Sequence, residues 1–193
     1  MANIQHSALT DPNLHEPKGA STAASGKVYV ANGSGSGSWE YISGHSYGEL
    51  YITGGTTTQT LPASSATAKL NPTGTWTANG NKDVTLSAAN GTITVARSGE
   101  YKLDFWISFT TASLAAGTKY YFHYAVNGTP STRKIVMQKH TSGADILTVC
   151  STGLTTLSAN DVVSIYVGGD GTSSSTLITP MEASFIVTLI DAN

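Results

Sequence analysis

The feature that most constrains the fold is a series of short apolar segments, which recur from Trp39 to the end of the chain. Gly, Asn, Asp, Ser and Pro separate them at the spacing of strands in a sandwich or barrel. The Ala-rich stretch 112–116 is short and stops at Gly117, so no amphipathic helix competes. We predict an all-β domain of about ten strands in two sheets. The expected strands cover 48–53, 57–61, 83–87, 91–96, 99–110, 119–126, 133–140, 146–152, 161–167 and 181–190.

Alternation along two of these strands indicates which side chains are buried. In 101–109 the odd positions are all apolar, and the opposite face is polar except for Trp106. In 119–126 we expect Phe122, Tyr124 and Val126 to point inward, which leaves Tyr121 and His123 outward.

The last strand breaks this pattern. Phe185, Val187 and Leu189 share one face, whereas Ile186 and Ile190 occupy the other. A strand that is apolar on both faces is covered on both faces. In a two-sheet domain without helices, we expect the second cover to be another copy of the chain, and an exposed Trp106 would join that contact.

The first 38 residues have a different composition from the rest. Their only consecutive apolar group is 28–31, and they end in the Gly/Ser run 33–38, which is typical of a flexible linker. This segment is too polar to form its own core, so we expect an extended arm (1–38) that a partner orders, followed by a single β domain (39–193).

Composition excludes several classes of function. Ten Lys and Arg against twelve Asp and Glu provide no basic field for nucleic acid. No apolar run approaches the length of a membrane span, and the amino terminus does not have the pattern of a signal peptide, so we expect synthesis in a cytosol and no membrane partner. The single cysteine, Cys150, cannot form an internal disulfide, and we interpret it as a small core residue.

No motif indicates catalysis, a metal or a cofactor. His6 and His15 are nine residues apart, which matches no regular ligand spacing, and the Gly-x-Ser-x-Gly match at 33–37 lies in the linker. The loop 168–171 is followed by no helix or array of carboxylates, so we interpret it as a tight surface loop. The aromatic residues Trp39, Tyr41, Tyr47 and Tyr51 are compatible with sugar stacking, although we favour packing within or between subunits.

Three segments of the β domain resemble the jelly-roll family of the complement C1q globular head and tumour necrosis factor. They are Gly99–Phe105, similar to a Gly-x-Tyr-x-Phe strand, then Leu157–Ile165, similar to Leu-x-x-Gly-Asp-x-Val, and the closing 184–189. Asn160 replaces the usual Gly of that turn, and Asn also tolerates the left-handed conformation. The resemblance implies a two-sheet antiparallel jelly-roll sandwich that forms a homotrimer around an axis lined by one sheet. The expected trimer-interface residues are Trp106, Tyr121, His123, Ile186 and Ile190.

The amino-terminal segment is similar to the leader of structural proteins of tailed bacteriophages, such as head fibres and capsid decoration proteins. The resemblance is carried by Ile4–Gly19, by Val28–Gly33 and by the Gly/Ser junction before Trp39. It implies a virion component on the capsid surface, attached to the major capsid protein. The expected anchoring residues are His6, Leu9, Asp11, Pro12, His15, Glu16, Pro17, Lys18, Val28, Tyr29 and Val30. The alternative is a tail-fibre or receptor-binding protein that recognises a host surface glycan.

Overall fold

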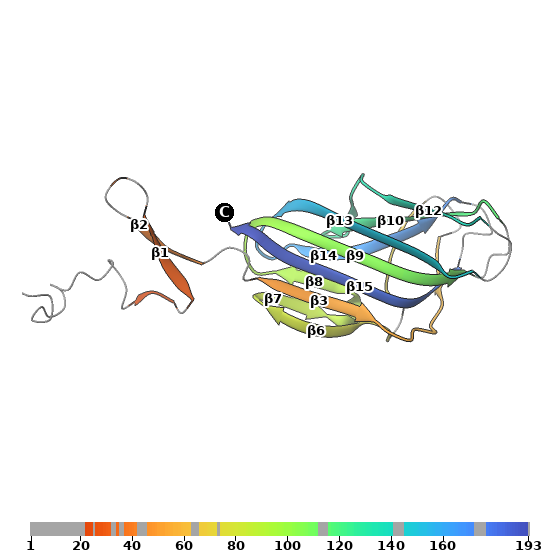
Figure 1. The fold of residues 1–193 in the computed structure, drawn as a ribbon, viewed down its shortest axis with the longest axis horizontal. Helices are drawn as coiled ribbons and strands as arrows, with labels where there is room; N and C mark the ends of the chain where they lie inside the picture. The colour runs from red at the N-terminus through yellow and green to blue at the C-terminus, as the bar shows by residue number, and fades with distance from the viewer. Residues whose placement is uncertain are drawn as a thin grey trace, which may run out of the picture. The chain divides into compact units, whose positions relative to one another are not determined.

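The structure is a computed structural model, and it divides the chain into two compact units, Met1–Ile42 and Ser43–Asn193 (Figure 1). The predicted boundary at residue 38 falls inside a strand, so the first unit extends slightly further than the sequence indicated. The structure describes residues 22–24, 26–31, 34, 37–41, 46–62, 66–72, 74–111, 116–140, 145–171 and 177–192.

The described part of the first unit contains a β-hairpin where the sequence suggested an extended arm and a linker. Strand β1 (Lys27–Ala31) pairs antiparallel with β2 (Gly37–Tyr41). Tyr29 lies opposite Trp39, and their rings meet edge to face with centroids 5.4 Å apart. An aromatic pair across two strands stabilises the hairpin, so the last two residues of the Gly/Ser run become part of a sheet.

The second unit consists of two antiparallel sheets. The six-stranded sheet has the order β13-β9-β15-β3-β6, and short β4 pairs with β15. The seven-stranded sheet has the order β11-β10-β14-β8-β7, with β12 on β10 and β5 on β14. The strands are β3 (Tyr47–Ile52), β4 (Gln59–Thr60), β5 (Ala68–Lys69), β6 (Thr77–Lys82), β7 (Val84–Ser87), β8 (Thr92–Val95), β9 (Gly99–Thr111), β10 (Lys119–Val126), β11 (Thr129–Pro130), β12 (Ile135–Gln138), β13 (Leu147–Leu157), β14 (Val162–Gly169) and β15 (Leu177–Ala192). The predicted two-sheet antiparallel sandwich is confirmed.

The core lies between the sheets, where the alternation placed it. The odd positions of β9 from 101 to 109 are at most 2% exposed, and Phe185, Val187 and Leu189 of β15 are fully buried. Phe122 of β10 packs against this layer, with ring centroids 5.4 Å from Phe109 and 5.8 Å from Phe105. Interdigitating aromatic and branched side chains from two inner faces are what hold a sandwich together.

Strand β6 was not predicted, because all of its side chains are exposed and none gives an apolar alternation. It pairs with β3 through its backbone, and Asn79 Nδ2 donates to Glu49 Oε2 across the pair at 2.7 Å. The predicted turn residues Asn127 and Asn160 adopt the left-handed conformation, with φ of 50° and 73°.

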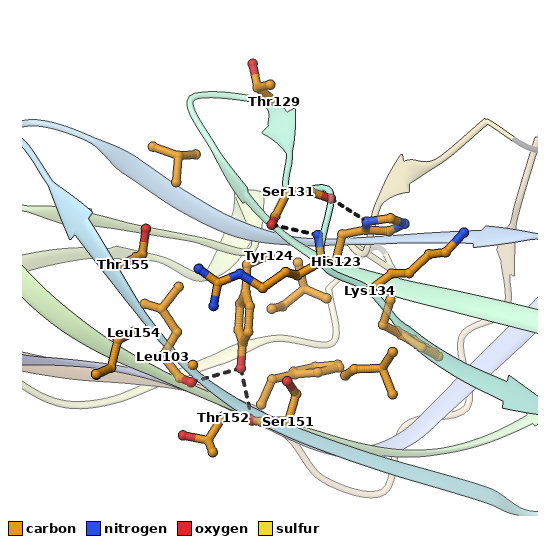
Figure 2. A pocket seen from close by; sticks show the side chains of 17 residues that line it. Leu103, His123, Tyr124, Thr129, Ser131, Lys134, Ser151, Thr152, Leu154 and Thr155 are labelled. Carbon is orange, nitrogen blue, oxygen red and sulfur yellow. Dashed lines mark hydrogen bonds between the residues drawn. The ribbon is translucent and has the colours of Figure 1, made fainter.

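Two tyrosine hydroxyls close the sandwich with polar contacts. The Tyr124 hydroxyl reaches across from β10 to the carbonyl oxygens of Leu103 (2.9 Å) and Ser151 (3.0 Å), on β9 and β13 (Figure 2). Burial raises the pKa of Tyr124 to about 12, so it remains a neutral donor at physiological pH. The hydroxyl therefore ties one sheet to two strands of the other.

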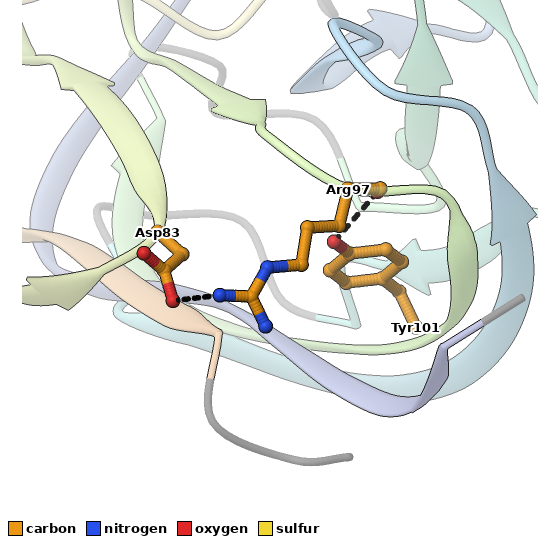
Figure 3. Close-up of polar contacts among 3 residues, drawn as sticks. All are labelled: Asp83, Arg97 and Tyr101. Carbon is orange, nitrogen blue, oxygen red and sulfur yellow. Dashed lines mark hydrogen bonds and ion pairs between the residues drawn. The ribbon is translucent and has the colours of Figure 1, made fainter. Parts of the chain in front are cut away.

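The second tyrosine, Tyr101, donates its hydroxyl proton to the Arg97 carbonyl at 2.9 Å (Figure 3). The Arg97 guanidinium forms an ion pair with Asp83, which has a φ of 53° between β6 and β7. Burial raises the pKa of Tyr101 as well. These three residues connect the β6–β7 turn to the β8–β9 connection, so a single polar cluster fixes two chain reversals.

Candidate subunit interface

The outer face of the six-stranded sheet carries aligned rows of side chains. One row runs from Cys150 on β13 through Trp106 on β9 and Ser184 on β15 to Tyr51 on β3. The next row consists of Thr152, Asp104, Ile186 and Glu49, and a third of Leu154, Lys102, Thr188 and Tyr47. Trp106 and Ile186 therefore occupy the same face in adjacent rows, as predicted.

Large apolar side chains on this face remain open to solvent. Trp106 is 42% exposed, Leu154 is 51% exposed and Tyr47 is 45% exposed. We call the face formed by Tyr47, Tyr51, Trp106, Cys150, Leu154 and Ile186 the assembly face. Such a grouping of apolar area on one flat sheet is typical of an interface, whereas isolated exposed apolar residues are common on any surface.

Polar contacts hold the centre of the assembly face in a fixed arrangement. The Ser184 hydroxyl donates to Glu49 Oε1 at 2.6 Å, while Asn79 occupies the other carboxylate oxygen. Lys102 and Asp104 form an ion pair at 3.0 Å. A shallow hollow of about 360 Å³ beside Trp106 is lined by Glu49, Tyr51, Glu182 and Ser184, among others. Trp106, which is 42% exposed, is itself part of the wall of this hollow.

Cys150 does not lie in the core, as the sequence suggested, but is exposed on the assembly face. Neighbouring residues on a strand point to opposite faces, and it is Val149, only 5% exposed, that takes the inward position. The expected core role was wrong because the flanking residues fixed the strand but not its phase.

Tyr121 and His123 lie away from the assembly face. Both belong to β10 in the seven-stranded sheet, so the structure does not bring them together with Trp106 and Ile186. Tyr121 lies beside Val136 of β12, and the Lys134 ammonium is 4.4 Å from its ring centroid. Ile190 lies on β15 at a register shift between Leu189 and Asp191, where it is exposed and has no partner position on β9.

The predicted anchoring residues fall mostly outside the described residues. They are His6, Leu9, Asp11, Pro12, His15, Glu16, Pro17 and Lys18. Of the remaining three, Val28 and Val30 are exposed on one face of β1, and Tyr29 packs on Trp39 on the other. In the described part of the chain, β1 pairs antiparallel with β2.

Several assembly-face residues were not predicted from the sequence. Tyr47 and Tyr51 were expected to pack within or between subunits but were not assigned to the trimer interface. Leu154 was placed in no strand, because the expected strand ended at residue 152. A period-two count through 147–157 would have shown that Cys150 and Leu154 share the outward phase.

Within the described ranges, no helix is long and apolar enough to cross a membrane. The same residues contain no group of three or more His, Cys, Asp or Glu side chains that could hold a metal ion.

Two solved structures are similar to this chain. The structure of Eiger TNF from S. frugiperda matches with a TM-score of 0.51 and 12% identity, covering 77% of this chain and 96% of that chain. The globular domain of zebrafish complement 1qA protein matches with a TM-score of 0.49 and 15% identity, covering 77% of this chain and 99% of that chain. No family model and no curated protein matches the sequence. The second unit is therefore a jelly-roll sandwich with the fold of a TNF domain.

Proposed function

We propose that this chain is a non-catalytic structural protein of a tailed-phage virion. It forms a homotrimer through the assembly face and attaches to the major capsid protein through its amino-terminal unit. The observation that carries the proposal is the group of solvent-exposed apolar side chains on one sheet face, with Trp106 at 42% exposure beside a hollow. Burying such area against further copies of the chain is favourable at roughly 25 cal/mol per Å².

A three-fold ring is the assembly that the sequence resemblance implies, and it explains how weak arms could bind firmly. In a ring each subunit uses two different surfaces, so the assembly face of one subunit meets another part of its neighbour. Three joined arms bind cooperatively, because after the first contact the others become intramolecular. The exposed side chains of Val28 and Val30 on one face of β1 support this strand as part of the attachment surface.

The test of assembly is the mass of the full chain in solution by light scattering. We expect three times the 20.0 kDa of one chain. Ile186→Asp should reduce the mass to that of a monomer, because assembly would bury a third carboxylate beside Asp104 and Glu49 with no partner of opposite charge. Trp106→Ala should do the same without a charge, since its side chain is outside the core.

The matched control is Val136→Asp, which changes an apolar side chain of 50% exposure on β12 of the seven-stranded sheet. It should leave the trimer intact. Alkylation of Cys150, the only cysteine, gives a second readout: the thiol should be protected in the trimer and reactive in the Ile186→Asp monomer. A monomeric wild-type chain with a freely reactive Cys150 would refute the assembly.

The alternative is a tail-fibre or receptor-binding protein that recognises a host surface glycan. The feature that favours it is a pocket at one edge of the sandwich, described below. Antibody labelling of purified virions separates the two candidates: label over the whole head supports capsid decoration, whereas label at the tail supports the alternative.

A further inference from the structure

A pocket opens between the two sheets along one edge of the jelly roll. Its cavity volume is about 170 Å³, and it lies between β13 of the six-stranded sheet and β10–β12 of the seven-stranded sheet. Figure 2 shows His123 and Lys134 at one end, Leu154 and Thr155 at the other, and Tyr124 between them. We call this cavity the edge pocket.

The edge pocket exists because β13 has small side chains at inward positions where large ones would be needed to fill the space between the sheets. Its inward positions begin with Leu147 and Val149 and end with Leu157, but Ser151, Gly153 and Thr155 lie between them. A Cβ added at Gly153 would meet no atom within 4 Å. Protein interiors are normally packed without such gaps, so the sequence leaves room here that its own side chains do not fill.

The inner wall of the edge pocket combines apolar and hydroxyl groups. Leu103, Phe105, Phe122 and Ile165 provide an apolar floor. Hydroxyl side chains surround it, and they are Thr129, Ser131, Ser151 and Thr155. The Tyr124 hydroxyl contacts two main-chain carbonyls and so holds the inner wall rigid. Apolar surface with several polar groups at its margin is the usual composition of a small-molecule site.

The charged residues of the edge pocket are all basic. They are Arg133 and Lys134, and no Asp or Glu lines the pocket. The ion pairs between described residues, Arg97–Asp83 and Lys102–Asp104, involve neither Arg133 nor Lys134. His123 Nδ1 donates to the Ser131 carbonyl at 2.8 Å, which fixes the imidazole beside the pocket. In a chain of net charge −2, this local excess of cations favours an anion.

We propose that the edge pocket binds a sugar carrying a carboxylate, of the hexuronic acid class. The carboxylate would face Arg133, and the Lys134 ammonium, which lies over the Tyr121 ring, would add to the positive field. The ring hydroxyls would contact the Ser and Thr side chains, and the apolar face of the ring would lie on Leu103 and Phe122. A free phosphate would use the cations but leave the apolar floor uncovered. This site lies inside one subunit, so the proposal goes beyond assembly and holds for attachment to head or tail.

Isothermal titration of the full chain with glucuronate tests the proposal, with glucose and inorganic phosphate as comparison ligands. We expect millimolar binding of glucuronate that weakens as salt is added, and much weaker binding of glucose and phosphate. Arg133→Ala combined with Lys134→Ala should weaken glucuronate binding at least about tenfold, the loss expected for a charge-assisted contact. Lys82→Ala, which removes an exposed cation on β6, is the matched control and should leave binding unchanged.

A second variant tests the cavity itself. Gly153→Leu should fill the edge pocket and abolish binding, and a thermal melt will show whether the variant folds. Equal affinity for glucose and glucuronate would overturn the role of the cations. The proposal would also be overturned if phosphate bound as tightly as glucuronate and the Gly153→Leu variant still bound glucuronate. The site would then be a surface anion contact and not a sugar pocket. Absence of glucuronate binding would overturn it directly. Light scattering of each variant reports assembly separately, so failure of this site is distinguishable from failure of the trimer.

Discussion

Single hydroxyl groups carry much of the polar connection between the two sheets. The Tyr124 hydroxyl contacts both β9 and β13. Strand β13 lies at the edge of its sheet, and the edge pocket leaves part of its inner face without apolar packing. Few core side chains hold β13 at this point. We therefore expect the Tyr124 hydroxyl to contribute more to the free energy of unfolding than an average hydrogen bond does.

Tyr124→Phe should lower the free energy of unfolding by about 1–2 kcal/mol, because two buried carbonyl oxygens lose their donor. The same residue predicts a dependence on pH. Its pKa of about 12 lies above the ordinary value of 10.0, so the folded state holds the proton more tightly than the unfolded chain. This stabilisation is complete below pH 10 and is lost as the pH rises toward 12.

Urea denaturation at several pH values measures both effects. Burial also raises the pKa values of Tyr101 and Tyr120, so wild-type stability should fall above pH 10 and tyrosinate absorbance should show a late phase. The Tyr124→Phe variant should lose part of that fall. A wild-type midpoint that stays constant from pH 9 to 12 would contradict the assignment.

At the scale of elements, the pairing of β9 with β15 leaves no room for a side chain at the start of β9. Gly99 begins β9 opposite Ala192, and a Cβ there would lie 2.2 Å from the Asp191 carbonyl oxygen. We expect Gly99→Ala to lower the free energy of unfolding by about 1–3 kcal/mol, because one of the two strands must shift.

Gly153→Ala is the matched control, because the same methyl group enters the open edge pocket and meets no atom within 4 Å. Its unfolding midpoint in urea should stay close to that of the wild type. Equal losses in both variants would show that strand propensity, and not the backbone contact at Gly99, determines the effect.

A strand could be predicted where its own side chains alternate between apolar and polar, and could not where only its pairing with another strand places it. In β9 the alternation of large apolar side chains fixed both the strand and its buried face. Strand β6 has no such signal, because its place is set by backbone pairing with β3, which is distant in the sequence. Strand β2 also lacks an apolar signal at its start, where its residues are Gly and Ser, so composition alone indicated a linker although its partner β1 is close in the sequence.

The candidate sites show a second limit. Alternation separates inward from outward residues, but a sandwich has two outer faces, one on each sheet, and alternation does not tell them apart. Trp106 and Ile186 were correctly placed on one face, whereas His123 was grouped with them although its strand belongs to the other sheet. The edge pocket exists because Gly153 has no side chain. The sequence alone could not predict this pocket, because it does not show that Gly153 pairs with Leu103 on the neighbouring strand.

At the scale of the whole molecule, assembly and attachment are assigned to different units. Among the described residues, the buried hydrophobic core cluster lies between Leu50 and Leu189, in the second unit. The described hairpin of the first unit is held by the β1–β2 backbone ladder and the Tyr29–Trp39 pair, and it adds no residue to the hydrophobic core cluster. We therefore expect the second unit to fold and assemble by itself, while a single arm binds its target weakly.

Deletion of residues 1–42 tests this division. The remaining 43–193 should unfold at the same urea concentration as the full chain, because no core residue is removed, and should keep a trimeric mass by light scattering. In a sedimentation assay it should fail to bind purified empty phage heads, whereas the full chain should bind them.

The Ile186→Asp monomer, which keeps its arm, should bind heads far more weakly than the trimer. Each arm then acts alone, and the effective concentration supplied by the joined arms is lost. Undiminished binding by 43–193 would place the attachment surface on the jelly roll and contradict the role of the arm, whereas undiminished binding by the monomer would show that one arm suffices.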